Sequence, residues 1–390
     1  MKLIDFFPSE AATGAHLWIL DEAIPREVLV HLPAGDVLTN RMDIVGQCYQ
    51  YHAERFQPLQ AEGLALNAVD LPVDDSQLNP HRDALKPPRN VIYLNDFQFQ
   101  NLPQYDCIFF YLSQQKRVNH HIIANVVTRL TANGCFYLMG EKSQGIKSYG
   151  QLCSQLLTVC DQQKSKQRWR YRYTAHDQSL ARLVEQGLDQ NRYHQIDDIG
   201  EHDGQRIQSK AGVFGWQKID QGSRFLVAHL DEFFKTMPFI KNDRDPANSR
   251  LSQTILDLGC GYGYLSLAAS GYQFGHYHAS DVNVAATAMA SLNLAFLGDR
   301  VTVSLDDCAR HLNARFHYII CNPPFHQGKA VAPALTQLFL SQTHRLLHPG
   351  GHGLFVVNAF IGLEKKATAL FGQVNILAHN AQFKLIHLQR

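Results

Sequence analysis

Short apolar runs alternate with helix-like stretches along the second half of the chain. The apolar runs have the length and the aliphatic or aromatic content of buried strands, and the stretches between them have helical periodicity. The predicted strands are residues 255–258, 276–280, 301–305, 316–321, 353–358 and 383–389. The predicted helices are residues 265–270, 284–297 and 330–347. This alternation predicts an α/β domain with a doubly wound, mostly parallel sheet, an antiparallel C-terminal strand, and a ligand at the carboxyl ends of the strands.

The first half of the chain contains a weaker copy of the same pattern. Residues Tyr105–Tyr111 parallel Phe316–Asn322. After a helical stretch, Leu130–Met139 parallels Leu347–Val356. Such self-similarity predicts an internal duplication, with chance likeness between two α/β halves as the alternative. We expect two tandem Rossmann-like domains joined by a polar stretch, with bounds 1–190, 191–209 for the linker, and 210–390.

Composition narrows the class of protein. Hydrophobic residues make up 45% of the 390 residues and charged residues 18%, as in a folded globular protein. Lys and Arg (36) nearly balance Asp and Glu (35), so any contact with nucleic acid must be local. Eight cysteines form no CxxC pair and twenty histidines no HExxH pattern, so we expect reduced thiols and no metal site. No apolar run suits a bilayer and the first residues do not resemble a signal peptide, so we expect a cytoplasmic protein without a membrane partner.

A glycine-rich turn, Asp257-Leu-Gly-Cys-Gly-Tyr-Gly263, directly follows the first apolar run. Glycine has no Cβ, so backbone N–H groups in such a turn can approach a ligand closely. The spacing favours S-adenosylmethionine (AdoMet) over a dinucleotide, which would need glycine where the chain has Tyr264. Carboxylates after the next two strands would accept the ribose hydroxyls (Asp281) and the adenine amino group (Asp306 in preference to Asp307). The predicted cofactor-binding residues are Asp257, whose carboxylate would take the ligand's ammonium, Gly259, Gly261, Gly263, Asp281 and Asp306.

A second motif, Asn322-Pro323-Pro324-Phe325, follows the apolar run that ends at Cys321. An aryl amine is a weak nucleophile, because its lone pair is delocalised into the ring. A protein that accepts both N–H bonds turns that lone pair toward the methyl carbon. The side-chain oxygen of Asn322 and the carbonyl of Pro323 are the predicted acceptors, Pro324 stiffens the backbone, and Phe325 would stack on the target ring. Cys321 precedes the asparagine and is expected to fill the strand rather than act as a nucleophile.

Together the two motifs resemble those of class I AdoMet-dependent N-methyltransferases. From about residue 210 onward the chain resembles the RsmC family of bacterial small-subunit rRNA guanine-N2 methyltransferases. The further stretches that carry this resemblance are Gly212–Gly215, Ile219–Ser223, with Ile where the family has Leu, Asn322–Gly328, Asn358–Phe360, Phe383-Lys384 and, in the first half, Gly140–Ser148.

The resemblance implies a fold, a reaction and a partner. It implies two tandem methyltransferase domains, of which the N-terminal one is degenerate, holds no cofactor and supports folding or RNA binding. It implies methyl transfer from AdoMet to the exocyclic N2 of a guanine in 16S rRNA. The expected partner is therefore rRNA in the small ribosomal subunit, and we expect the enzyme to be a monomer.

Four alternatives stay open at this point. The sister family RlmG, which acts on large-subunit rRNA, shares the motifs. An adenine-N6 enzyme or a glutamine-N5 enzyme also uses an Asn-Pro-Pro-aromatic motif. A non-catalytic RNA-binding factor is the alternative outside enzymes, but a decayed copy would not be expected to keep Asp257, Asp281 and Asn322.

The most basic stretch lies in the first half. Its alternation places Arg168, Arg170 and Arg172 on one face of a predicted strand, with aromatic residues on the other. We expect the arginine face to meet rRNA phosphates, and an edge strand with a solvated arginine face is the alternative. Lys142 and Lys147, which flank a glycine-containing loop, are further candidates.

Overall fold

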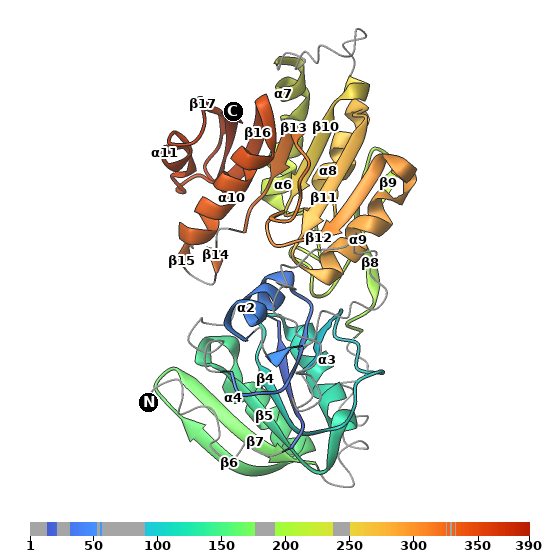
Figure 1. The fold of residues 1–390 in the computed structure, drawn as a ribbon, viewed down its shortest axis with the longest axis vertical. Helices are drawn as coiled ribbons and strands as arrows, with labels where there is room; N and C mark the ends of the chain where they lie inside the picture. Colours follow the sequence, from blue (N-terminus) through green and yellow to red (C-terminus); the bar gives the residue numbers. More distant parts are fainter. Residues whose placement is uncertain are drawn as a thin grey trace, which may run out of the picture. The chain divides into compact units, whose positions relative to one another are not determined.

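The computed structural model divides the chain into two compact units, residues 1–195 and 196–390 (Figure 1). It describes residues 14–21, 32–52, 55–56, 90–175, 192–236, 250–324, 326–327, 330–331 and 333–390. The stretch expected to be a linker, 191–209, is mostly an antiparallel hairpin of β8 (Ile196–His202) and β9 (Gln205–Lys210). This hairpin belongs to the second unit. Its polar composition reflects the exposure of β8 rather than an unstructured connection.

Seven strands form the sheet of the second unit, in the order β12-β11-β10-β13-β16-β18-β17. The first five run parallel to one another, β18 is antiparallel to β16, and β17 is antiparallel to β18. The strands are β10 (Thr254–Leu258), β11 (His276–Asp281), β12 (Val301–Leu305), β13 (Phe316–Cys321), β16 (Leu347–Asn358), β17 (Gln373–His379) and β18 (Phe383–Gln389). Each predicted strand is present. The additional strand, β17, was missed because most of its residues are exposed and it has no clear apolar run.

Helices cover both faces of this sheet. The helices are α6 (Gln221–Val227), α7 (Leu230–Thr236), α8 (Tyr264–Ala269), α9 (Val284–Leu294), α10 (Pro333–Leu346) and α11 (Leu363–Ala367). The short elements are η8 (Arg250–Ser252), η9 (Ser270–Tyr272), η10 (Ala295–Arg300), β14 (His326–Gln327) and β15 (Ala330–Val331). Because successive side chains of a strand point to opposite faces, Ile255 packs in the core beneath α6 to α9, and Leu256 packs in the core beneath α10 and α11.

The predicted helix over 330–347 is shorter than expected at its start. The proline–glycine stretch expected to end it lies inside β16, which begins at Leu347 rather than at residue 353. Leu347 pairs with Phe316, and the next pair joins His352 to Tyr318. β16 therefore advances five residues where β13 advances two, and Gly350 in this bulge has a φ of 76°.

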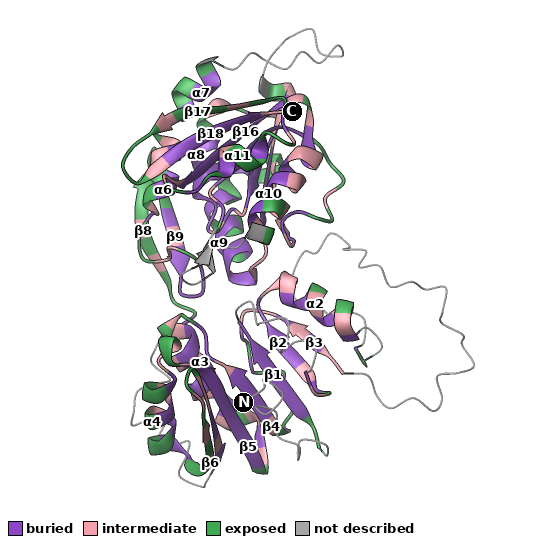
Figure 2. Ribbon diagram, turned by 90° about the vertical axis from the view of Figure 1, so that its left-hand side faces the viewer, coloured by how far each residue is buried: buried purple, intermediate pink, exposed green. Residues whose placement is uncertain are grey.

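The first unit has a sheet of the same order, β3-β2-β1-β4-β5-β7-β6. Its strands are β1 (His16–Leu20), β2 (Asp36–Thr39), β3 (Ile92–Leu94), β4 (Tyr105–Tyr111), β5 (Leu130–Glu141), β6 (Thr158–Lys164) and β7 (Arg168–Thr174). Its helices are α2 (Met42–His52), α3 (Lys116–Val126) and α4 (Ile146–Leu156), with short η5 (Val127–Arg129) and η6 (Lys142–Gln144). Buried residues, purple in Figure 2, concentrate on the central strands of each sheet. The two tandem methyltransferase-like domains predicted from the sequence are confirmed.

The copies agree in an irregular detail as well. Tyr105 of β4 pairs with Leu130 of β5, and the next pair joins Cys107 to Cys135. β5 thus carries a bulge of the same length as the one in β16, at the corresponding place. Two unrelated α/β domains need not share such a bulge, so the duplication explains the likeness better than chance does.

Candidate functional site

The glycine-rich turn connects β10 to α8. Gly259, Gly261 and Gly263 have φ values of 77°, 54° and 84°, the left-handed region in which a side chain is strained. The amides of Gly259 and Cys260 donate to the carbonyl of Ser280, at 2.8 and 3.0 Å. A Cβ added at Gly261 would meet nothing within 4 Å, so open space lies beside the turn. The predicted role of these glycines as a backbone cradle fits this geometry.

Asp257 lies beneath the turn and is 1% exposed. Its Oδ2 accepts hydrogen bonds from the backbone amide and the hydroxyl of Ser266, both at 2.9 Å. Its Oδ1 is buried and has no hydrogen-bond partner among the described residues. Burial raises the pKa of this carboxyl to about 7. A buried acceptor without a donor is costly, and a ligand ammonium or a bound water would satisfy it.

Asp281 ends β11 and joins two loops of the same sheet edge. Its Oδ2 accepts from the amide of Gly261 (2.9 Å) and its Oδ1 from the amide of Asn283 (3.0 Å). The side chain of Asn283 caps α9 and donates to the carbonyl of Gly212 (3.3 Å). The stretch that begins at Gly212, noted above only for its resemblance, is thereby held at this edge.

The acid predicted to accept the adenine amino group is already engaged in the structure. Asp306 is 3% exposed, and its two oxygens accept from the amide of His311 (2.9 Å) and bond the ring of His311 (2.8 Å). The next residue, Asp307, has a more exposed side chain at 22% and pairs with Arg310 (3.2 Å). This arrangement favours Asp307 over the predicted Asp306, whose contacts fix the loop instead.

Asn322 stands at the carboxyl end of β13, the neighbour of β10 in the sheet. Its Nδ2 donates to Oδ2 of Asp220 (2.8 Å) and to the hydroxyl of Ser223 (2.9 Å). The same Asp220 oxygen caps α6 by accepting from the amide of Ser223 (2.9 Å). Both amide protons of Asn322 thus bond to Asp220 and Ser223 at the start of α6, which orients the remaining atom, Oδ1, as an acceptor.

The hydrogen bonds from Asn322 to Asp220 and Ser223 were not predicted, although the stretch 219–223 was noted for its family resemblance. A Cβ at Gly222 would lie 3.0 Å from the Asp220 carboxylate and 3.2 Å from the ring of Phe383, so glycine lets α6 approach this site closely. The sequence signal was an aspartate directly before a helical stretch, since aspartate is a preferred helix N-cap residue. Asp220 and Ser223 lie 102 and 99 positions before Asn322, so a local sequence pattern does not reveal that they bond to it.

The rest of the second motif is partly described. Pro323 is buried and Pro324 is exposed, whereas the predicted stacking residue Phe325 lies outside the described residues. Cys321 is buried, its thiol donates to the carbonyl of Leu258 (3.0 Å), and burial raises its pKa well above the ordinary range. A protonated thiol in the core suits the filling role predicted for it.

The predicted RNA-binding arginines lie on β7, between β5 and β6, so this is not an edge strand. Arg168 pairs with Glu141 (3.3 Å), and Arg172 donates to the thiol of Cys135 (3.4 Å). Arg170 is 5% exposed and pairs with Asp161 at 3.2 Å. Burial and this ion pair weigh against a phosphate contact for Arg170, which stays a prediction.

The lysines differ from the arginines. Lys142 and Lys147 are exposed, and the ammonium of Lys142 lies 5.9 Å from the centre of the Trp169 ring.

Within the described residues there is no group of His, Cys, Asp and Glu side chains that could hold a metal ion. None of the described helices is long and apolar enough to cross a membrane.

Comparisons with known proteins relate this chain to methyltransferases. Residues 204–387 match the family "Methyltransferase small domain". The ribosomal RNA small subunit methyltransferase C of Shewanella amazonensis is 23% identical over 290 residues, which are 74% of this chain and 78% of that protein. The ribosomal RNA large subunit methyltransferase G of the same organism is 30% identical over 195 residues, 48% of this chain and 46% of that protein.

A solved structure covers nearly the whole chain. The Thermus thermophilus 16S rRNA N2 G1207 methyltransferase RsmC, in complex with AdoMet and guanosine, superposes with a TM-score of 0.67. The superposition covers 97% of this chain and 88% of that one, at 19% sequence identity, and shows a shared fold.

The fold and the site define a class I methyltransferase, with the catalytic motifs in the second of two tandem domains. Within this class, the chain is similar to the RsmC methyltransferases of other bacteria.

Proposed function

We propose that this protein transfers a methyl group from AdoMet to the exocyclic N2 amine of a guanine in 16S rRNA. The observation that carries the proposal is the orientation of Asn322, whose amide nitrogen is held by Asp220 and Ser223. An amide fixed in this way offers its oxygen to an N–H donor at the carboxyl edge of the sheet. The same substrate and cofactor are named for the Thermus thermophilus RsmC structure.

The residues around the glycine turn suit AdoMet as the cofactor. Asp257 offers to an ammonium an Oδ1 that has no hydrogen-bond partner among the described residues. Asp281 stands at the strand end where ribose hydroxyls would be accepted, and Asp307 has a more exposed carboxylate for an adenine amine. Open space beside Gly261 leaves room for the ligand. When bound, AdoMet supplies an electrophilic methyl group on a sulfonium.

The chain's own contribution to the reaction is to aim the amine. The Oδ1 of Asn322 and the carbonyl of Pro323 would each accept one N–H bond of the guanine N2, which draws its lone pair out of conjugation. No strong base is required, because the nitrogen becomes acidic only after it has gained the methyl group, and its proton can then pass to water. Because Asp220 and Ser223 already fix the Asn322 amide, no conformational entropy is lost in orienting it during each turnover.

An rRNA guanine must leave its base stack to reach this edge. Contacts with the flanking RNA are proposed for the exposed Lys142 and Lys147, whereas Arg168 and Arg172 would have to exchange their present partners for phosphate. We also propose that the enzyme acts as a monomer in the cytoplasm, where rRNA is made and assembled.

A large-subunit substrate is the second candidate. It is favoured by the higher identity, 30%, of the methyltransferase G relative, which extends over about half of this chain. The two candidates share every residue of the site described above and differ only in the RNA.

The test is methylation of defined RNA by the purified full chain with labelled AdoMet. The substrates are 16S rRNA, 23S rRNA and both ribosomal subunits from cells lacking the corresponding enzymes, and the product nucleosides are identified by mass spectrometry. We expect N2-methylguanosine in 16S rRNA or the small subunit. N2-methylguanosine in 23S rRNA would establish the second candidate, and N6-methyladenosine would overturn both.

A further inference from the structure

The carboxyl edge of the first sheet can be matched residue by residue to that of the second. In the first unit the amide of Asn95, just after β3, donates to the carbonyl of Thr39 at the end of β2 (3.0 Å). In the second unit the amide of Asp306, just after β12, donates to the carbonyl of Asp281 at the end of β11 (2.9 Å). The strand registers give the same correspondence.

The loops that follow these bonds have the same backbone conformation. Phe97 and Cys308 each lie three residues after the last strand residue, and their φ values are 51° and 53°. Residues other than glycine, asparagine and aspartate rarely adopt this conformation, so its presence in both loops marks an inherited path. Asp96 of the first unit therefore holds the place of Asp307 in the second. Asp307 is the carboxylate that the proposed function assigns to the adenine amine.

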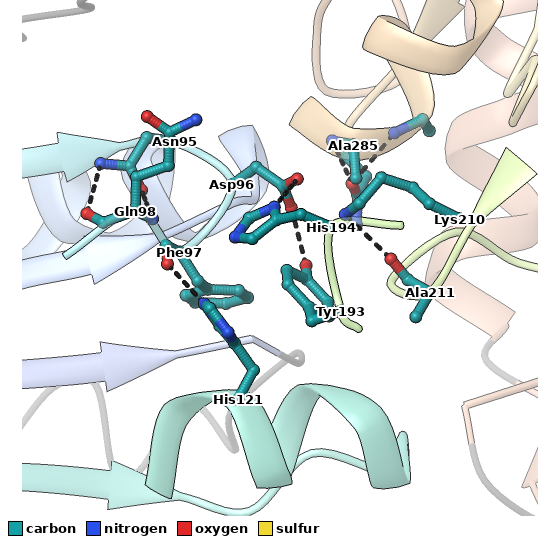
Figure 3. Close-up of polar contacts among 12 residues, drawn as sticks. Asn95, Asp96, Phe97, Gln98, His121, Tyr193, His194, Lys210, Ala211 and Ala285 are labelled. Atoms are coloured by element: carbon teal, nitrogen blue, oxygen red, sulfur yellow. Dashed lines mark hydrogen bonds and ion pairs between the residues drawn. The ribbon is translucent and has the colours of Figure 1, made fainter. Parts of the chain in front are cut away.

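The Asp96 carboxylate already has partners from its own chain. Its Oδ1 accepts a hydrogen bond from the hydroxyl of Tyr193 at 2.7 Å, and its Oδ2 lies 3.4 Å from Nδ1 of His194 (Figure 3). Tyr193 thus brings a flat ring with a polar hydrogen to the carboxylate after the third strand. An adenine base would present the same two features to Asp307 in the second unit.

The ring of Tyr193 is buried as a bound base would be. It is 2% exposed and stacks on the imidazole of His121, with centroids 4.7 Å apart and planes 23° from parallel. The imidazole is in turn fixed by a 2.9 Å contact between its Nε2 and the carbonyl of Phe97, as Figure 3 shows. Burial and the nearby Asp96 raise the pKa of the Tyr193 hydroxyl well above its ordinary value, so it stays a donor.

The segment that carries Tyr193 is bent to deliver it. Arg192 has a φ of 55°, and the amide of Gln195 donates back to its carbonyl (3.0 Å). A left-handed arginine is strained unless the surroundings hold it. This strained turn places Tyr193, the residue that follows Arg192, beside Asp96.

We propose that Tyr193 occupies, in the first unit, the adenine position of an ancestral cofactor site, with Asp96 and His121 as its hydrogen-bond and stacking partners. This inference rests on the proposed function for the position of adenine in the second unit. It makes the first unit a methyltransferase fold whose base-binding position is filled by its own chain. Removal of the phenol ring should leave a cavity that accepts adenine.

The experiment compares the full chain with Tyr193→Ala and with a matched control, Tyr105→Ala. Tyr105 is equally buried in the first unit and its hydroxyl also donates to a carboxylate, that of Asp36 (2.8 Å), but it opens β4 at the opposite end of the sheet. AdoMet is kept at saturation so that the adenine position of the second unit is filled. Thermal unfolding is then measured with and without millimolar adenine, and with and without p-cresol.

We expect both substitutions to lower the melting temperature by several degrees, since each removes a buried aromatic ring. Adenine should raise the transition of Tyr193→Ala by about 2 °C or more, through binding to the native state alone. It should leave the wild type and Tyr105→Ala unchanged. An equal response of both variants, or a response of Tyr193→Ala to p-cresol but not to adenine, would overturn the proposal.

A second pair of variants serves if Tyr193→Ala does not fold. Indole has nearly the size of a purine and carries an N–H, so Tyr193→Trp should melt closer to the wild type than Tyr193→Phe, which removes the hydroxyl that donates to Asp96. A position shaped for tyrosine alone would give the opposite order, because tryptophan would overpack it. Titration of the wild type with AdoMet tests the proposed function separately. Its failure would leave the comparison between Tyr193 and Tyr105 variants intact.

Discussion

The carboxylate of Asp220 should act on catalysis through Asn322, and this can be measured. Asp220→Ala removes the 2.8 Å hydrogen bond from the Asn322 amide and the cap of α6 together. A hydrogen bond to a charged group contributes about 1.5–3 kcal/mol. Since a tenfold change in rate corresponds to about 1.4 kcal/mol, the expected loss of kcat is about 10- to 150-fold. The Kd for AdoMet should stay within about twofold, because no predicted cofactor contact is removed.

The assay is single-turnover methyl transfer to rRNA under saturating AdoMet, with binding measured by calorimetry. Ser223→Ala removes only the neutral contact of 2.9 Å and should cost less, about 2- to 10-fold. Asn322→Ala alone should lower kcat by about a hundredfold or more, as expected for an acceptor that works mainly in the transition state.

The decisive comparison is a double-mutant cycle. If Asp220 acts by orienting Asn322, then Asp220→Ala should have little further effect on kcat once Asn322 is alanine. Loss of the α6 cap alone would lower stability by about 1 kcal/mol in both backgrounds and would not produce this dependence. Equal rate losses from Asp220→Ala in the presence and absence of Asn322 would refute the orienting role.

Three further predictions test other parts of the molecule. Asp307→Ala should weaken AdoMet binding about tenfold, as for one lost charged hydrogen bond. Asp306→Ala should instead lower the melting temperature and change the affinity less. If calorimetry shows the larger loss of affinity for Asp306→Ala, Asp306 is the adenine acceptor. Burial raises the Asp257 pKa to about 7 from its ordinary 3.8, so between these values the folded state holds a proton that the unfolded state has lost. The free energy of unfolding without ligand should therefore fall as pH rises from about 4 to 7. Asp257→Asn should abolish this pH dependence in urea titrations, and an unchanged pH dependence would assign it to another group. Lys142→Ala with Lys147→Ala should weaken rRNA binding and reduce the log–log salt dependence by about two units, and an unchanged slope would place the RNA surface elsewhere.

The central strands and the polar residues at their ends could be predicted because short-range pattern decides them. Residues 255–258 and 316–321 are buried and mostly apolar, with Asp257 and His317 as exceptions, because both faces of each strand are covered, and each strand leads into its motif. The edge strand β17 could not be found in this way, since exposure leaves it without a regular apolar pattern. The hairpin over 196–210 was taken for a linker for the same reason.

The site residues divide along a similar line. Asp257, Asp281 and Asn322 could be proposed from the sequence because each lies at or next to the carboxyl end of a buried strand, and parallel strands end at one edge. The choice between Asp306 and Asp307 depends on the bond from His311, and the role of Asp220 depends on a contact across 102 positions of sequence. Local pattern contains neither piece of information.

The matching bulges of β5 and β16 bear on the history of the chain. Each inserts three extra residues at the same step of the fifth strand, between pairs that are otherwise in register. A shared irregularity of this kind is most simply inherited from one ancestral gene, so it predates the duplication. The glycine turn and the asparagine motif, by contrast, survive in one copy only. After the duplication, selection in the first copy maintained the shape of the sheet but not the two motifs at its carboxyl edge.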